Sequence, residues 1–235
     1  MEIIKKRKNL SKSRLKLQEK SNTSSGLEEF PSDQVLQVWN TAAPTLIAHI
    51  SEVGLPLQNQ QIRMITTKAF NSIAFLDLIC SRERILKTYI CCYSIDYESG
   101  VVISRLAEQG KLGECTFLIS NIRNSAYRKK EKVMRDLFLS NPKIRLVFCG
   151  SHAKLMAIQT EKNHYVIETS ANFAANSRIE QYLFENSKIM FDFHSEWIDN
   201  IDKIATEKEL AGYDFSGKKI RGENKFKDCI VDGTK

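Results

Sequence analysis

The stretch GSHAKLMAIQTEKNHYVIETSAN, residues 150–172, contains two apolar runs separated by the polar turn TEKN. AKLMAI and HYVIET have the composition of buried strands, and the short turn between them predicts a hairpin. His152 and Lys154 lie at the start of the first strand, and Ser170 and Asn172 follow the second. Residues two apart in a strand point to the same face. The hairpin is therefore expected to bring these four polar side chains together at its open end.

The chain before this hairpin alternates between apolar runs of strand composition and segments with helical spacing of apolar residues. The predicted strands are 61–70, 87–95, 114–120 and 143–148, and the predicted helices are 71–85, 99–110 and 130–140. Strands that alternate with helices through short links are typical of an α/β fold. We therefore expect a mixed, mostly parallel sheet with helices on both faces.

The predicted α/β domain covers residues 61–205. Residues 32–60 are expected to be a helical N-terminal segment, because Ser32 can cap a helix and Pro44 can begin a second one. Residues 1–31 are basic and then rich in Ser and Thr, which predicts a disordered tail. Residues 206–235 are polar and charged and are expected to be a partly disordered C-terminal tail.

The positive charge of the chain is concentrated at its N-terminus. The net charge is +7, from 35 Lys and Arg against 28 Asp and Glu. Residues 1–20 contain eight Lys and Arg and two Glu, so they contribute +6 and the other 215 residues contribute only +1. Such a tail is suited to nucleic acid or to an anionic membrane surface. The alternative is a solvated leader without a partner.

The six cysteines and the N-terminal sequence predict a cytoplasmic protein. Most of the cysteines lie in apolar runs and none forms a Cys-x-x-Cys pair, as expected for buried residues in a reducing compartment. The N-terminus has no apolar signal segment, and no apolar stretch reaches the length of a membrane span. We therefore expect no integral membrane association.

The four polar residues of the hairpin are chemically suited to a phosphodiester. A lysine and an asparagine can hold the non-bridging oxygens, and an imidazole can attack the phosphorus atom. His49, His164 and His194 fit no motif. The sequence has no cluster of His, Cys and carboxylates at metal-ligand spacing, so neither a metal nor another cofactor is expected.

The pattern His152-x-Lys154, Ser170-x-Asn172 and Glu180, together with the α/β order of residues 61–195, resembles a half-site of the phospholipase D superfamily. The resemblance implies a phospholipase D-like half-domain and a metal-independent reaction through a covalent phosphohistidine. A second histidine, from the other half-site, would protonate the leaving group. This chain has one motif, so the resemblance implies a homodimer.

Glu180 has two interpretations. The resemblance implies that its carboxylate orients the catalytic imidazole, whereas the spacing from Ser177 fits a capping box at a helix start. Two other positions depart from the family pattern: Gln159 stands where the family often has Asp, and Thr169 stands where it has Gly.

The leading functional hypothesis is a nuclease, with DNA as the expected substrate. The expected phosphate-binding residues lie in the tail and in a second basic cluster: Lys5, Lys6, Arg7, Lys8, Arg128, Lys129 and Lys130. One alternative is a lipid phosphodiester hydrolase or transferase, although the tail lacks the aromatic residues that interfacial helices usually carry. The other is a dimeric nucleic-acid-binding module without catalytic activity, which Gln159 and Thr169 favour.

Overall fold

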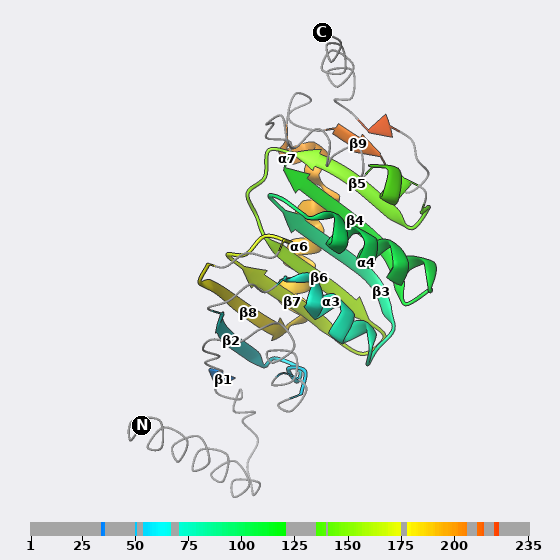
Figure 1. The fold of residues 1–235 in the computed structure, drawn as a ribbon. Coiled ribbons are helices and arrows are strands. Elements are labelled where there is room, and N and C mark those ends of the chain that lie inside the picture. Colours follow the sequence, from blue (N-terminus) through cyan, green and yellow to red (C-terminus); the bar gives the residue numbers. More distant parts are fainter. Residues whose placement is uncertain are drawn as a thin grey trace, which may run out of the picture. The chain divides into compact units, whose positions relative to one another are not determined.

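The computed structural model describes residues 34–35, 50, 54–66, 71–120, 135–139, 141–174, 178–205, 211–213 and 219–220. By its internal contacts the chain divides into Met1–Phe30 and Pro31–Lys235, and all described residues belong to the second unit. The described strands form one ten-stranded sheet in the order β1-β2-β8-β7-β6-β3-β4-β5-β9-β10. Figure 1 shows this order across the sheet.

The strands are β1 (Gln34–Val35), β2 (Gln61–Thr66), β3 (Ile85–Cys92), β4 (Leu112–Ser120), β5 (Ile144–Cys149), β6 (Leu155–Thr160), β7 (His164–Thr169), β8 (Glu180–Asn186), β9 (Ala211–Tyr213) and β10 (Lys219–Ile220). The helices are α3 (Ile73–Cys80), α4 (Tyr97–Glu108), α6 (Lys188–Asp199) and α7 (Ile201–Ile204). Residues 135–139 are also helical, within the helix predicted for 130–140.

The predicted α/β class is confirmed, but the parallel part of the sheet is smaller than expected. β3, β4 and β5 are parallel, as the strand–helix alternation predicts. Of the nine described pairings, however, six are antiparallel. The reason is that β6 and β7 are joined by a tight turn, which requires antiparallel neighbours, and β6 then pairs antiparallel with β3.

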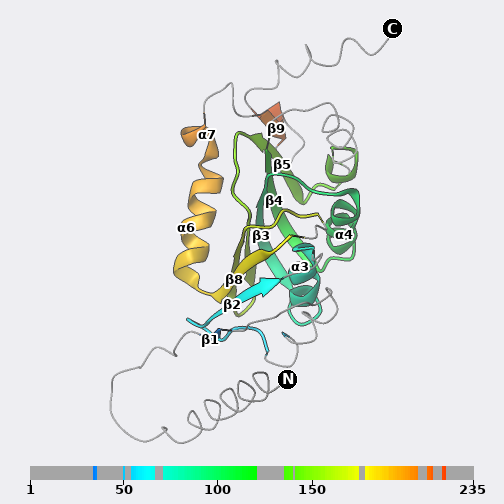
Figure 2. The same ribbon diagram turned by 60° about the vertical axis from the view of Figure 1, so that its left-hand side comes forward.

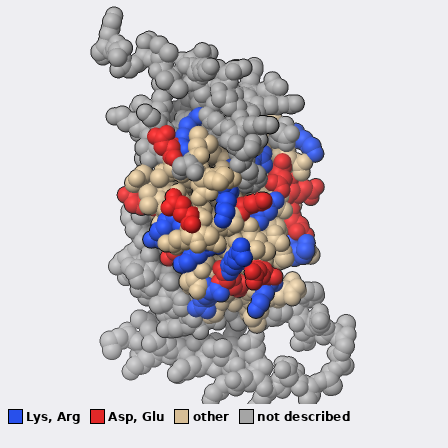
Figure 3. Space-filling model, turned by 90° about the vertical axis from the view of Figure 1, so that its right-hand side faces the viewer, with Lys and Arg blue, Asp and Glu red and all other residues tan. Residues whose placement is uncertain are grey.

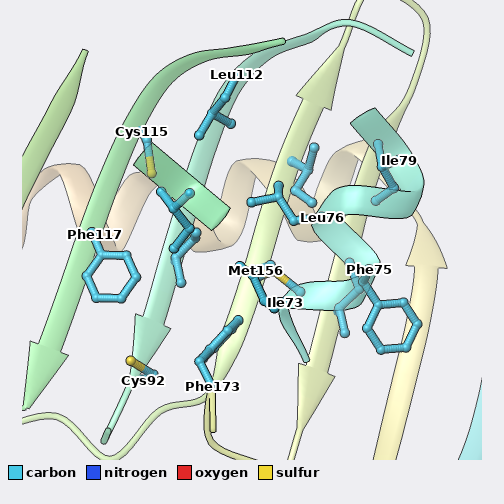
Figure 4. Packing of buried hydrophobic residues seen from close by; sticks show 14 of the residues in the cluster. Ile73, Phe75, Leu76, Ile79, Cys92, Leu112, Cys115, Phe117, Met156 and Phe173 are labelled. Atoms are coloured by element: carbon cyan, nitrogen blue, oxygen red, sulfur yellow. The ribbon is translucent and has the colours of Figure 1, made fainter. Parts of the chain in front are cut away.

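Helices cover both faces of the sheet, as predicted. Figure 2 shows α3 and α4 on one side of the strands and α6 on the other. α3 and α4 bury residues such as Phe75 and Ile103 against one face, and α6 buries Phe191 and Ile198 against the opposite face. Figure 4 shows part of the first core, with Ile73, Phe75 and Leu76 of α3 and with Met156, Leu112 and Phe117 of the sheet.

Two predicted segments outside the sheet core need correction. Gln34–Val35 form strand β1 beside β2, so the helix predicted from Ser32 is wrong at these residues, although Ile50 is helical. Within the predicted C-terminal tail, Ala211–Tyr213 extend the sheet by pairing with β5. In both places a sheet edge offers unpaired backbone groups, and this tertiary contact overrides the local composition.

The turn of the β6–β7 hairpin is held by the carboxylate of Glu83. It accepts hydrogen bonds from Thr160 Oγ1 at 2.5 Å, Tyr165 Oη at 2.7 Å and Asn163 Nδ2 at 2.9 Å. Burial opposes ionisation, but these hydrogen bonds outweigh it and lower the pKa of Glu83 below its usual 4.5. The charged form of Glu83 therefore stabilises the hairpin whose open end carries the motif.

We expect Glu83→Gln to lower the free energy of unfolding by about 1–3 kcal/mol at neutral pH, because a charged acceptor is replaced by a neutral one. The folded-state pKa lies below the unfolded value, so this stabilisation is complete above about pH 4.5 and is lost as the pH falls through the folded value. Urea denaturation of both proteins from pH 7 to pH 3 measures the difference. A gap that stays constant over this range would contradict the assignment.

Candidate active site

The open end of the β6–β7 hairpin lies at the edge of the sheet where the parallel strands β3, β4 and β5 end. Thr169 N donates to the carbonyl oxygen of Lys154 at 3.1 Å, so the two arms are paired up to this point. β3 is the neighbour of β6 on the other side, with Cys91 opposite Leu155. Ligands of open α/β sheets bind outside the carboxyl ends of the strands, which is where these polar residues lie.

His152 and Lys154 are in direct contact. They precede β6 in an irregular extended segment. The prediction that they lie at the start of the strand is therefore wrong. Lys154 Nζ lies 3.1 Å from His152 Nδ1 and 3.0 Å from the His152 carbonyl oxygen. The imidazole is exposed, whereas the lysine is half-buried. A solvent-accessible ring nitrogen and an ammonium group therefore share one small site.

This contact determines the tautomer of His152. An ammonium group has three donors and no lone pair, so Nδ1 must accept the hydrogen bond and Nε2 must carry the ring proton. In this state Nε2–H can donate a hydrogen bond, but Nε2 has no free lone pair and cannot attack an electrophile. Nucleophilic attack requires Lys154 to leave Nδ1 and the ring proton to move there.

Asn172 is held rigidly beside the end of β3. Its neighbours Ala171 and Phe173 are fully buried, and Phe173 N donates to the Ser94 carbonyl oxygen at 3.2 Å. Asn172 Oδ1 accepts from Ser94 N at 3.3 Å. Figure 4 shows Phe173 and Cys92 at the same end of the core. Because the amide oxygen is occupied by the backbone, the NH2 group is the part of Asn172 that is suited to donate to a ligand.

Ser170 and Glu180 form the other side of the site. The Ser170 hydroxyl donates to the Glu180 carboxylate and accepts from Gln181 N at 3.1 Å. Glu180 is the first residue of β8 and pairs with Thr66 of β2. The capping-box interpretation of Glu180 is therefore wrong: the residue begins a strand, not a helix.

The charges of Lys154 and Glu180 act on each other. Partial burial lowers the pKa of Lys154, and the negative charge of Glu180 opposes this shift. The two side chains are thus near enough to interact electrostatically, which places Glu180 in the same site as Lys154. The five residues of the motif lie at one edge of the sheet, with direct contacts between His152 and Lys154 and between Ser170 and Glu180. Their roles in a common site stay predictions.

The two positions that depart from the family pattern have separate structural settings. Gln159 pairs with His164 next to the hairpin turn, about 17 Å along the strand from Lys154. It therefore lies outside the site. Thr169 accepts a hydrogen bond from Ala171 N through its hydroxyl at 2.9 Å, which supports the bend that carries Ser170.

The other described histidines lie away from this site, on the face covered by α6. His164 packs its ring against Phe191. His194 Nε2 lies 2.9 Å from Glu168, and its Nδ1 accepts from Trp197. His49 and the predicted phosphate-binding residues Lys5, Lys6, Arg7, Lys8, Arg128, Lys129 and Lys130 lie outside the described residues.

Sequence analysis missed Tyr93, which contacts the site from the end of β3. Its ring centroid lies 4.9 Å from that of His152, with 50° between the ring planes. An aromatic residue after an apolar strand is a weak signal by itself. Only the pairing of β3 with β6, which are separated by two intervening strands in sequence, places Tyr93 beside the imidazole.

Metal-binding clusters and membrane-spanning helices are both absent from the described part of the chain. It contains no group of three or more His, Cys, Asp and Glu side chains arranged to hold a metal ion. Among its helices, none combines the length and the apolar character needed to cross a bilayer.

Comparison with known proteins found structural similarity only. No family model and no curated protein matches the sequence. A polyphosphate kinase from Porphyromonas gingivalis matches with a TM-score of 0.46 and 13% identity, covering 67% of this chain and 28% of the kinase. A phosphatidylserine synthase from Haemophilus influenzae Rd KW20 matches with a TM-score of 0.42 and 12% identity, covering 65% of this chain and 39% of the synthase. With TM-scores below 0.5, neither similarity assigns a function.

We expect the Nε2–H tautomer of the His152 imidazole in the free protein, because Lys154 occupies Nδ1. The ring ¹⁵N chemical shifts distinguish the two tautomers, and His152→Gln identifies the signals. Lys154→Met should remove this preference, whereas Lys162→Met, in the exposed hairpin turn, should leave it unchanged. A protonated Nδ1 in the wild-type protein would contradict the contact.

Proposed function

We propose that this chain is a metal-independent phosphodiesterase of the phospholipase D type, which cleaves nucleic acid through a covalent phosphohistidine. The observation that carries the proposal is the convergence of His152, Lys154, Ser170, Asn172 and Glu180 at one edge of the sheet. These residues come from both arms of one hairpin and from the first residue of β8. Ionic, hydroxyl and amide groups around an exposed imidazole form a site suited to a phosphodiester anion.

In the first step the phosphate binds between Lys154 and Asn172. The ammonium leaves His152 Nδ1 for a non-bridging oxygen, and the Asn172 amide donates to another. Nδ1 then takes up the ring proton, which frees the lone pair of Nε2. Nε2 attacks phosphorus, the P–N bond forms and the P–O bond to the leaving group breaks.

The leaving oxygen needs a proton, and in the second step water must be deprotonated before it hydrolyses the P–N bond. One imidazole cannot be both the phosphorylated group and this acid and base. Of the histidines that the structure describes besides His152, both His164 and His194 are engaged on the α6 face of the sheet. We therefore propose that His152 of a second copy supplies the proton and later accepts one from water. To act as the donor, this His152 must be doubly protonated, with Lys154 away from Nδ1, because a neutral ring N–H is too weak an acid.

Nucleic acid is the proposed substrate because of where the positive charge lies. On the face in Figure 3, Lys and Arg side chains are interspersed with Asp and Glu side chains. Residues 1–20 instead hold eight cations against two anions. A polyanion with regularly spaced phosphates can engage such a tail while one phosphodiester occupies the site.

Purified protein should cleave plasmid DNA, single-stranded DNA or RNA, and should leave phosphatidylcholine vesicles intact. Activity should survive millimolar EDTA, because the lysine and amide neutralise the phosphate without a Lewis acid. His152→Gln should abolish turnover, and Lys154→Ala should raise the barrier by about 2–4 kcal/mol. The matched control is His164→Gln, which removes a half-buried imidazole that packs against Phe191 on the face covered by α6. This variant should remain active.

Each alternative has its own outcome in this experiment. Cleavage of phosphatidylcholine alone would support lipid chemistry. Binding of DNA without cleavage would support the inactive binding module. Activity that disappears with EDTA and returns with magnesium would overturn the phosphohistidine route.

The proposed second copy predicts a dimer. Light scattering should give about 54 kDa, twice the 26.9 kDa of one chain. A two-fold axis at the site would place both copies of His152 near each other. Specific activity should therefore fall on dilution below the dissociation constant of the dimer. A monomer with undiminished specific activity would exclude a site shared between two chains.

Residues 1–20 should act through phosphates without sequence preference. Their deletion should weaken binding to two unrelated duplexes equally and flatten the plot of log K against log salt, by about 0.9 for each phosphate that the tail neutralises. Eight cations set the upper limit. Turnover at saturating substrate should change little. Equal slopes for full-length and truncated protein would show that the tail does not contact phosphates.

A further inference from the structure

We propose that Tyr93 is a positioning residue for His152, and that its ring holds the imidazole in place while Lys154 moves to the substrate phosphate. This inference rests on the proposed function of the site. The two rings are in contact, with centroids 4.9 Å apart and planes inclined by 50°. Ring pairs at this separation attract each other in tilted geometries and restrict each other's rotation.

The imidazole needs such a restraint because its other described partner moves away during the reaction. His152 is exposed and lies in the irregular segment before β6, so no strand pairing or close packing fixes it. Lys154 contacts both Nδ1 and the carbonyl oxygen of His152 in the free protein. When the ammonium binds the phosphate, it leaves Nδ1 at the moment when Nε2 must point at phosphorus.

Tyr93 is suited to this role because its own backbone is fixed on both sides. Cys92, before it, is fully buried at the end of β3. Ser94, after it, is tied through N to Asn172 Oδ1 and through its carbonyl oxygen to Phe173 N. Residues 92–94 therefore position both the Tyr93 ring beside His152 and the Asn172 amide that is proposed to bind the phosphate. In the proposed reaction, the end of β3 thus positions both the nucleophile and the phosphate.

The ring, not the hydroxyl, makes this contact. Within the part of the chain that the structure describes, the Tyr93 hydroxyl has no hydrogen-bond partner, whereas the ring faces the imidazole. Phenylalanine can preserve the ring contact, and leucine cannot. The pair Tyr93→Phe and Tyr93→Leu therefore separates positioning by the ring from any action of the hydroxyl.

The experiment compares kcat and KM of these two variants on the best nucleic-acid substrate. Tyr93→Leu should lower kcat about 10- to 100-fold, because a misdirected nucleophile loses rate rather than binding, and should leave KM within about two-fold. Tyr93→Phe should keep kcat within about two-fold. Equal reduction of kcat in both variants would assign the effect to the hydroxyl, and full activity of Tyr93→Leu would overturn the proposal.

A second readout does not depend on activity. The ¹³C relaxation of the His152 ring is measured in the presence of saturating inorganic phosphate, with equal circular dichroism spectra as evidence of intact folding. The ring should stay ordered in the wild-type protein and in Tyr93→Phe and become mobile in Tyr93→Leu. An equally ordered ring in Tyr93→Leu would overturn the positioning role. If no variant cleaves nucleic acid, the proposed function fails, while the relaxation data still decide the role of Tyr93.

Discussion

The antiparallel pairing of β6 with β3 is the constraint on which the site depends. It joins two parts of the sheet that differ in strand direction. Strands β3, β4 and β5 are parallel, and strands β6, β7, β8 and β2 are antiparallel. Because β6 runs against β3, its first residues lie where β3 ends. His152 therefore lies beside Tyr93, and the chain leaving β7 returns to Ser94. A parallel arrangement would place the motif and the end of β3 at opposite edges.

The site has a rigid part and an adjustable part. Asn172 is held between the buried residues Ala171 and Phe173 and by the backbone of Ser94. By contrast, the contact between Lys154 and His152 is solvent-exposed and is made with a long, flexible side chain. An ammonium that occupies a ring nitrogen in the free protein can exchange it for a phosphate oxygen. In the proposed reaction, substrate binding would therefore change the tautomer of His152 and free Nε2 for attack on phosphorus.

The opposite end of the hairpin is built for stability. There the Glu83 carboxylate accepts hydrogen bonds from Thr160 of β6, Asn163 of the turn and Tyr165 of β7. Asn163 Oδ1 also accepts from Asn186 of β8. The contact between Glu168 and the buried His194 ties β7 to α6. These polar interactions fix the register of β6, β7 and β8 from the closed end and from one face, so that the open end can present exposed polar groups.

The sequence by itself determined the local part of this architecture. The hairpin and the α/β alternation before it follow from strand periodicity and one turn, which act over neighbouring residues. The turn also brings the segment with His152 and Lys154, just before β6, to the same end of the hairpin as Ser170 and Asn172, just after β7. The tertiary structure decided what depends on distant segments. Glu180 fits a helix cap by local spacing, but its backbone pairs with β2 and makes it a strand residue. Tyr93 lies about 60 residues before His152, and only the β3–β6 pairing brings their rings together. Strand order and direction are set by which faces and edges can be buried together, and the composition of either strand alone does not contain that information.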